Sequence, residues 1–371
     1  MRIGAPRETA ADEERVALVP ETAGRLAKAG HQVVIETGAG ERAGYTDEAY
    51  RQAGAAIAPG AAGVLGETDL VAKIQKPSPE EISALKPGSI LVALLLARSD
   101  PDTVKALADR GVSVLAMELV PRIARAQSMD VLSSQASIAG YKAVLIAANS
   151  QGKYFPMMMT AAGTIPPAKV LVIGAGVAGL QAIATAGRLG AAVEAYDVRT
   201  AARDQVRSLG ARFIEVPGAA DAEAAGGYAR EQTEEERRRA QEVLAEHVMA
   251  SDVVITTAAI PGRPAPKIVT EEMVKGMRPG AVIVDLAAET GGNCALTEPG
   301  KVTTVNGVII HGPLNVPSSM AHHASQLYSR NVASLLSLLT DKDGNPNLNF
   351  EDEVLDAMCV AHDGKVRLEL R

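Results

Sequence analysis

Three glycines near the middle of the chain, Gly174, Gly176 and Gly179, have the spacing G-x-G-x-x-G. An apolar run typical of a β-strand precedes them, and an Ala- and Leu-rich helical pattern follows. In such a unit the first glycine permits a tight turn, the second lets a pyrophosphate approach the backbone, and the third lets helix and strand pack closely. The helix would begin at Val177, where unpaired N–H groups and a partial positive charge suit phosphates. These four residues therefore predict a dinucleotide site.

A carboxylate follows the second strand of this βαβ unit: Asp197 comes 23 residues after Gly174. An acid at this point accepts both hydroxyls of an adenosine ribose and repels a 2′-phosphate, so it favours NAD(H) over NADP(H). Arg199 leaves the other preference open, because an arginine near this position can accept a 2′-phosphate. The alternative interpretation is that the glycines serve packing alone and bind no nucleotide. Against it, strand, helix, second strand and acid all occur in the expected order.

No residue stands out as the acid–base group that oxidation of an alcohol or amine requires. Adjacent residues on a helix point about 100° apart, so the neighbours His322 and His323 do not suggest a metal site, and no Cys/His cluster has ligand spacing. Three other histidines lie at a helix end, on a charged helix and in a C-terminal turn: His31, His247 and His362. Hydride exchange between two nicotinamides needs no proton transfer, and the protein then has only to hold two rings face to face.

A polar set occurs between the last strand-like run of the N-terminal half and a long helical pattern that starts at Ser128. Its members are Arg122, Gln127, Asp130 and Ser133. The last three have the spacing i, i+3, i+6, which would place them near one helical face. The spacing leaves two interpretations open: residues that orient a bound ring, or a helix N-cap in which Arg122 pairs with Asp130.

Composition narrows the class of protein. The chain has 371 residues, 47% hydrophobic content and a net charge of −7, which indicates two domains and argues against a nucleic-acid partner. Two cysteines fit a reducing compartment without disulfides. The N-terminus lacks a signal-peptide pattern, and no apolar run approaches the roughly 18 to 20 residues of a membrane span; Ile90 to Ala97 is the longest candidate.

Strand-like and helical patterns alternate along both halves of the chain, which predicts an α/β fold with two Rossmann-like, doubly wound parallel-sheet domains joined by long helices. The first domain is expected at residues 1–132 with 320–371. The second is expected at 133–319, bracketed by helical patterns from Ser128 and from Met320 to Thr340. Residues 217–231 are small and Gly-rich, typical of a mobile loop or of a plain connection; Tyr228 is the only large side chain there.

Four segments carry a resemblance to a known family: PRIARAQSMDVLSSQASIAGYKAV, FPMMMTAAGTIPPAKVLVIGAGVAGLQAIATAGRLGA, TTAAIPGRPAPKIVTEEMV and VIVDLAAETGGNC. They closely resemble the NAD(H)-binding alpha subunit, or domain I, of proton-translocating NAD(P) transhydrogenase. The resemblance spans nearly the whole chain. It implies a homodimer with NAD(H) on this chain and NADP(H) on a membrane-bound partner subunit. Hydride would pass directly from NADH to NADP+, coupled to proton translocation, and only with the partner present. The protein would be cytoplasmic, held peripherally at the cytoplasmic face of the inner membrane.

The same resemblance implies roles for individual residues. The set of Arg122, Gln127, Asp130 and Ser133 would orient the nicotinamide end. Residues expected to border the adenosine, to close over the nucleotide or to contact it elsewhere are Asp197, Val198, Arg199, Gly227, Tyr228 and Ala259.

Alanine dehydrogenase is a related alternative, because MRIGAPRE, ERVALVP and LVAKIQKP resemble that family as well. There an Arg and a Lys bind pyruvate, and a His works with an Asp. Arg15 is present here, but Gln75 stands at the Lys position, Leu96 at the His position and Glu289 at the Asp position. Losing the imidazole removes the proton-transferring group of oxo-acid chemistry. A third alternative is a non-catalytic NAD-binding regulator, although a sensor has no need of a nicotinamide-orienting set.

Overall fold

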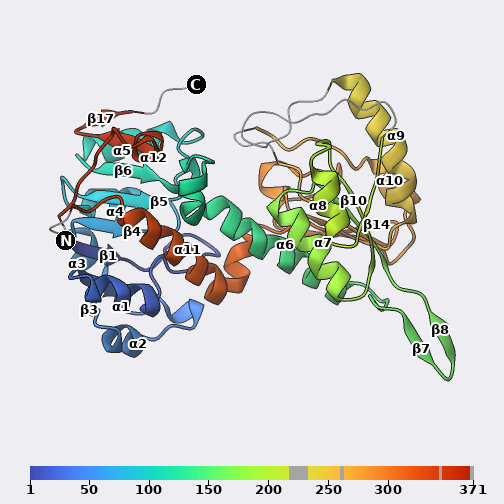
Figure 1. The fold of residues 1–371 in the computed structure, drawn as a ribbon, viewed down its shortest axis with the longest axis horizontal. Helices are drawn as coiled ribbons and strands as arrows, with labels where there is room; N and C mark the ends of the chain where they lie inside the picture. The colour runs from blue at the N-terminus through green and yellow to red at the C-terminus, as the bar shows by residue number, and fades with distance from the viewer. Residues whose placement is uncertain (217–232, 260–262, 342–344, 368–371) are drawn as a thin grey trace. The chain divides into compact units, whose positions relative to one another are not determined.

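The computed structural model describes residues 1–216, 233–259, 263–341 and 345–367. The chain divides into two compact units, named here unit 1 (Met1–Gln135 with Pro317–Arg371) and unit 2 (Ala136–Val316). Figure 1 shows that unit 1 combines the N-terminal and C-terminal parts of the chain, while unit 2 is the continuous middle part. The whole expected loop at 217–231, with Gly227 and Tyr228, lies outside the described residues.

Unit 1 is built on an eight-stranded sheet with the order β17-β16-β6-β5-β4-β1-β2-β3. The strands from β6 to β3 pair in parallel, whereas β16 and β17 pair antiparallel at one edge. The strands are β1 (Arg2–Ala5), β2 (Gln32–Glu36), β3 (Ala56–Ala58), β4 (Leu70–Ala72), β5 (Ile90–Ala93), β6 (Ser113–Ala116), β16 (Cys359–His362) and β17 (Lys365–Val366).

Several helices of unit 1, namely α2, α4, α5 and α12, begin where a polar side chain caps their first N–H groups. Ser78 and Glu81 form a reciprocal capping box at α4, and Thr46 and Asp100 cap α2 and α5. The helices are α1 (Pro20–Lys28), α2 (Asp47–Gln52), α3 (Ala61–Leu65), α4 (Pro79–Ala84), α5 (Pro101–Asp109), α11 (Ala321–Leu336) and α12 (Glu353–Met358). The 3-10 helices are η1 (Glu41–Ala43), η2 (Met117–Leu119) and η3 (Ala124–Met129), and η6 (Val316–Met320) begins at the last residue of unit 2 and continues in unit 1.

Unit 2 is built on a seven-stranded sheet with the order β11-β10-β9-β12-β13-β15-β14, parallel except for β14. The strands are β9 (Lys169–Ile173), β10 (Ala192–Tyr196), β11 (Arg212–Phe213), β12 (Val253–Thr256), β13 (Val282–Asp285), β14 (Val302–Val305) and β15 (Val308–His311). A separate hairpin of β7 (Met158–Thr160) and β8 (Gly163–Ile165) projects from the rest of the unit in Figure 1. The helices are α7 (Val177–Arg188), α8 (Ala202–Ser208), α9 (Glu234–Ala250), α10 (Glu271–Gly276) and the 3-10 turn η5 (Ala288–Thr290).

One long helix, α6 (Val131–Ser150), begins in unit 1 and continues in unit 2. Its 20 residues are long and apolar enough to span a membrane, so the expectation that no such segment exists was wrong. Small residues and serines are interspersed among the large apolar residues of α6, so its sequence does not form a continuous apolar run. Val131 belongs to the core of unit 1, and Ala143, Val144 and Ala147 belong to that of unit 2. Core packing therefore accounts for part of the apolar character of α6, since 39% of its apolar window is buried.

Each parallel sheet is covered on both faces, which is the property that defines a doubly wound fold. In β9, Val170 and Val172 pack with residues of α6, α7 and α8, while Leu171 and Ile173 pack with residues of α9 and α10. In unit 1, α1, α11 and α12 cover one face, and α4 and α5 cover the other. The predicted α/β class with two Rossmann-like sheets is confirmed.

Candidate dinucleotide site

The turn between β9 and α7 has the backbone geometry that the glycine spacing predicts. Gly174 has φ +97°, a left-handed conformation that side chains other than Gly rarely adopt. A Cβ on Gly179 would lie 1.7 Å from the carbonyl oxygen of Gly174, so only Gly allows the helix to approach the turn this closely. The hydroxyl of Thr257, at the end of β12, donates to the same carbonyl at 3.0 Å. The turn is therefore held from the neighbouring strand as well.

Gly176 differs from the other two, because a Cβ built on it meets no heavy atom of the protein within 4 Å. Its φ of −77° is available to any residue, so neither backbone strain nor packing requires Gly here. Because Gly176 has no side chain, the space directly before the first turn of α7 is open. The N–H groups of that turn have no side-chain cap. Open backbone at an uncapped helix N-terminus fits a pyrophosphate. Exposed Val177 starts that turn.

Contact between α6 and α7 adds a constraint that the sequence did not reveal. A Cβ on Gly140 of α6 would lie 2.0 Å from the carbonyl oxygen of Ala178 in the first turn of α7. The two helices thus touch backbone to backbone, and Gly140 sets the position of the helix end that would receive the phosphates. An isolated Gly in a helical pattern was the available signal.

Asp197 follows β10 as expected, but its carboxylate is fully engaged within the protein. Oδ2 accepts from the N–H of Ala175 at 2.7 Å and from the Arg199 guanidinium at 2.8 Å. Oδ1 accepts from the backbone N–H and from Nε of Arg199, both at 2.8 Å. Val198 is half-buried against the core of unit 2, and Ala259 is exposed after β12.

Buried polar side chains shape the loops at the carboxyl ends of β12 and β13. Asp285 is fully buried and accepts from four groups: the hydroxyls of Thr256 and Thr297 and the N–H groups of Ala287 and Cys294. Its carboxylate therefore holds the loops around it in place. Among described residues, no group of three or more His, Cys, Asp or Glu could hold a metal ion.

The polar set of unit 1 does not lie along one helix. The prediction that Gln127, Asp130 and Ser133 share one helical face was therefore wrong. Gln127 is exposed in the 3-10 helix η3, Asp130 is extended, and α6 starts at Val131. The Asp130 carboxylate accepts from the N–H of Ser133 at 2.9 Å and from its hydroxyl at 2.5 Å. This capping interaction satisfies the first turn of α6 and separates the two helices. Arg122 is exposed just before η3.

Two residues that the sequence did not single out hold this segment in place. Asn331 of α11 donates to the carbonyl of Ser128 at 2.7 Å and accepts from the hydroxyl of Ser134 at 2.7 Å. Arg125 donates to both carboxylate oxygens of Asp352 at 2.9 Å, which lowers the pKa of Asp352 below its usual range. Gln127 and Asp130 are therefore presented from a braced segment.

Four positions correspond to the pyruvate-binding and proton-transferring residues of alanine dehydrogenase, and their surroundings here do not suit that chemistry. Arg15 is buried and donates to Glu13 through Nε at 2.7 Å and one terminal nitrogen at 2.6 Å, and Gln75 donates to the same carboxylate at 2.8 Å. Glu13 thus occupies both groups that would face an oxo-acid carboxylate. Leu96, which follows β5, is 65% exposed with φ +53°. Glu289 accepts from the N–H of Asn315 at 2.6 Å.

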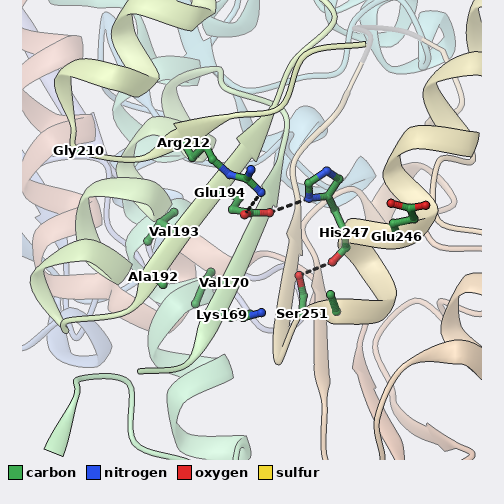
Figure 2. A pocket seen from close by; sticks show the side chains of 11 residues that line it. Lys169, Val170, Ala192, Val193, Glu194, Gly210, Arg212, Glu246, His247 and Ser251 are labelled. Carbon is green, nitrogen blue, oxygen red and sulfur yellow. Dashed lines mark hydrogen bonds and ion pairs between the residues drawn. The ribbon is translucent and has the colours of Figure 1, made fainter. Parts of the chain in front are cut away.

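Unit 2 also contains a cavity of about 580 Å³, whose lining side chains are drawn in Figure 2. It lies at the starts of β9 and β10, the opposite edge of the sheet from the glycine turn, and at the end of α9. Glu194 accepts there from Nδ1 of His247 at 2.7 Å and from Arg212. Burial would raise the pKa of Glu194, but hydrogen bonds from His247 and Arg212 lower it. The dinucleotide fingerprint is on the other edge and does not include this cavity.

These features define the class of protein: it is a two-unit Rossmann-like α/β protein in which one unit carries an intact dinucleotide fingerprint. Residues 4–139 match the family model described as alanine dehydrogenase/PNT, N-terminal domain, and residues 143–369 match the C-terminal domain model of the same family. The chain belongs to the alanine dehydrogenase/PNT family, which confirms the resemblance inferred from the sequence.

Individual relatives separate the two branches of that family. An NAD(P) transhydrogenase subunit alpha chain of Rhodospirillum rubrum is 49% identical over 374 residues, covering 99% of this chain and 97% of the relative. A solved transhydrogenase structure from Sinorhizobium meliloti is 44% identical with a TM-score of 0.87, covering 99% and 98% of the two chains. An alanine dehydrogenase from Halomonas elongata is 30% identical, covering 99% of this chain and 94% of the relative.

Proposed function

We propose that this chain is the NAD(H)-binding alpha subunit of a proton-translocating NAD(P) transhydrogenase. The observation that carries the proposal is the pairing of an intact dinucleotide fingerprint with apolar, exposed Leu96 at the place where the related oxo-acid chemistry needs an imidazole. Bound NADH supplies the hydride, and exchange with a second nicotinamide leaves no proton for this chain to carry. High identity to relatives named transhydrogenase subunit alpha supports the same choice.

The residues of unit 2 would hold the dinucleotide. Gly174, Gly176, Val177 and Gly179 would bind the pyrophosphate with backbone N–H groups and the N-terminus of α7. Asp197, Val198 and Arg199 would border the adenosine, and Ala259 would contact the cofactor beyond β12. Asp197 selects NAD(H), because a 2′-phosphate next to its carboxylate would be repelled.

The polar set of unit 1, of which Arg122 and Gln127 are exposed, would orient the nicotinamide end. Gln127 has both a donor and an acceptor to offer a carboxamide, and Arg122 offers a cation. Asp130 and Ser133, which are hydrogen-bonded to one another, would act chiefly by fixing the segment that presents Gln127. The role of these side chains is positioning, since none of them has to change its protonation state in a hydride exchange.

The partner in this proposal is a membrane-bound subunit that binds NADP(H) and couples hydride transfer to proton movement. The chain would then sit at the cytoplasmic face of the inner membrane through that partner. A homodimer is part of the proposal, and the hairpin β7–β8 supports it. Met159 of β7 is 78% exposed, and Met157, directly before β7, is exposed as well. A two-stranded hairpin is marginally stable by itself in water. A second copy would cover these side chains.

The test is a titration followed by a reconstitution. The purified chain should bind NADH more tightly than NADPH, as followed by fluorescence of the reduced nicotinamide. It should reduce NADP+ with NADH only after a membrane transhydrogenase subunit is added. Gln127→Asn should slow that transfer more than it weakens NADH binding, whereas Gln52→Asn, at an exposed site in α2, should change neither.

Two results would count against the proposal. Turnover of pyruvate and ammonia by the isolated chain would support the alanine dehydrogenase alternative. NADH binding without any stimulation of hydride exchange by membrane subunits would support a regulator.

A further inference from the structure

The adenosine-ribose position at the end of β10 is already occupied by a side chain of the protein. The Asp197 side chain is only 6% exposed, and the Arg199 guanidinium lies against it with a 20% exposed side chain. Two of its nitrogens donate to the two carboxylate oxygens in a bidentate pair, each at 2.8 Å. A ligand approaching from solvent would meet Arg199 before it met the carboxylate.

Acceptor capacity leads to the same conclusion. A carboxylate offers about four lone-pair positions, and Asp197 uses four: two for the guanidinium, one for the N–H of Ala175 and one for the N–H of Arg199. The two backbone N–H donors, of Ala175 in the glycine turn and of Arg199, keep the carboxylate oriented. The guanidinium, in contrast, is carried by a flexible side chain, so its two positions are the ones that a ribose diol can take over.

We propose that Arg199 is an internal occupant of the ribose subsite, whose guanidinium must leave Asp197 before an adenine nucleotide can bind. This inference rests on the proposed function, because it assumes that the dinucleotide uses the fingerprint. Displacement lowers the apparent affinity for every adenosine ligand, since only the fraction of molecules with an open carboxylate is competent to bind. Arg199 is only two positions after Asp197 in the sequence, so its released guanidinium stays near the ribose and is available to a 2′-phosphate.

Two opposite consequences follow for ligands that differ by that phosphate. For 5′-AMP, which has a free 2′-hydroxyl, Arg199 is a competitor. For 2′,5′-ADP, Arg199 is both a competitor and, once displaced, a counterion. Asp197 therefore limits binding of 2′-phosphorylated nucleotides in two ways: it repels the phosphate, and it holds the nearby cation.

The experiment measures 5′-AMP and 2′,5′-ADP binding to the full chain by calorimetry. If about four-fifths of the free protein is in the Arg199-bound state, Arg199→Met should tighten 5′-AMP about fivefold and weaken 2′,5′-ADP relative to 5′-AMP. Arg199→Lys keeps the charge but loses the two-pronged geometry, so it should tighten 5′-AMP by a smaller factor. Arg207→Met is the matched control, because Arg207 lies on α8 and pairs with Glu215 instead of Asp197.

A further variant, Asp197→Asn, separates the two effects of the carboxylate. It should release Arg199 and shift the ratio of affinities toward 2′,5′-ADP; urea unfolding checks that it folds. Weaker or unchanged 5′-AMP binding in both Arg199 variants would overturn the inference and make Arg199 an attractive contact. A wild-type chain that binds neither 5′-AMP nor NADH would instead contradict the proposed function itself.

Discussion

Asn293 and the backbone of Ala258 are joined by two hydrogen bonds that run in opposite directions. The N–H of Ala258 donates to Oδ1 of Asn293 at 3.0 Å, and Nδ2 of Asn293 donates to the carbonyl of Ala258 at 2.8 Å. Nδ2 also donates to the carbonyl of Pro266 at 2.9 Å. One fully buried amide thus fixes the chain after β12, directly next to Thr257, which binds the glycine turn.

Replacing that amide should loosen the site. Asn293→Ala leaves half-buried backbone groups of Ala258 and Pro266 without this partner, so the free energy of unfolding should fall by about 2 kcal/mol. NADH binding should weaken as well, because the segment containing Ala259 is no longer held. Urea unfolding and NADH titration measure the two effects. Asn149→Ala, at an exposed position of α6, should change stability by less than about 0.5 kcal/mol. Equal effects of the two substitutions would contradict the assigned role of Asn293.

The glycines of the fingerprint should respond differently to the same substitution. Gly176→Ala should leave stability unchanged, since its Cβ meets no protein atom, but should weaken NADH at least about tenfold, or about 1.4 kcal/mol, by filling the pyrophosphate space. Gly179→Ala should cost at least about 2 kcal/mol of stability, because its Cβ would overlap the carbonyl of Gly174.

Gly187, near the end of the same helix α7, is the matched control for both. A Cβ there meets nothing within 4 Å, and Gly→Ala inside a helix adds about 0.5–1 kcal/mol of stability. Thermal unfolding and NADH titration distinguish the three variants. Unchanged NADH affinity in Gly176→Ala would show that no phosphate lies against this turn.

Stability should fall as pH rises above the ordinary pKa of a carboxyl because of Glu8. Burial raises the pKa of Glu8 above 4.5, although Lys73 and the N–H groups of Ile74 and Gln75 act in the opposite direction. A raised pKa means that the folded state binds the proton more tightly than the unfolded state. The stabilisation is therefore complete below pH 4.5 and is lost as pH rises through the folded-state pKa.

Glu8→Gln removes that titration and tests its sign. The difference in unfolding free energy between Glu8→Gln and wild type should change in favour of the variant from pH 4.5 toward neutral pH, as measured by urea unfolding across the range. A difference that stays constant with pH, or that changes in favour of wild type, would show that the pKa of Glu8 is not raised in the folded protein.

A charge placed on the hairpin should dissociate the proposed homodimer. Met159→Glu introduces a carboxylate at the most exposed apolar side chain of β7, and burying it at an interface would cost several kcal/mol. Sedimentation velocity should then show a monomer, with NADH affinity retained because the hairpin is separate from the glycine turn. Thr160→Glu, on the other face of the hairpin, is the control and should remain a dimer. A wild-type monomer would contradict the dimer directly.

Much of the fold could be predicted because its signals are local. Strand β9 before Gly174, helix α7 from Val177 and strand β10 before Asp197 occur in the expected order, since buried parallel strands are short apolar runs and the glycine turn acts on its immediate neighbours. The edge strand β3, the antiparallel strand β14 and the hairpin β7–β8 were not predicted. They are short or exposed, so no continuous apolar pattern marks them.

What the sequence by itself determined is the set of residues whose role is expressed in their own backbone or immediate neighbours. Gly174 needs a left-handed φ, Gly176 needs no side chain, and Asp197 must follow the second strand. Tertiary structure alone decided which groups meet: Gly140 against Ala178, Asn293 against Ala258, and Arg199 folded back onto Asp197 in place of a ribose. Such pairings depend on how elements pack and on which rotamer a flexible side chain adopts, and residue spacing carries no information about either.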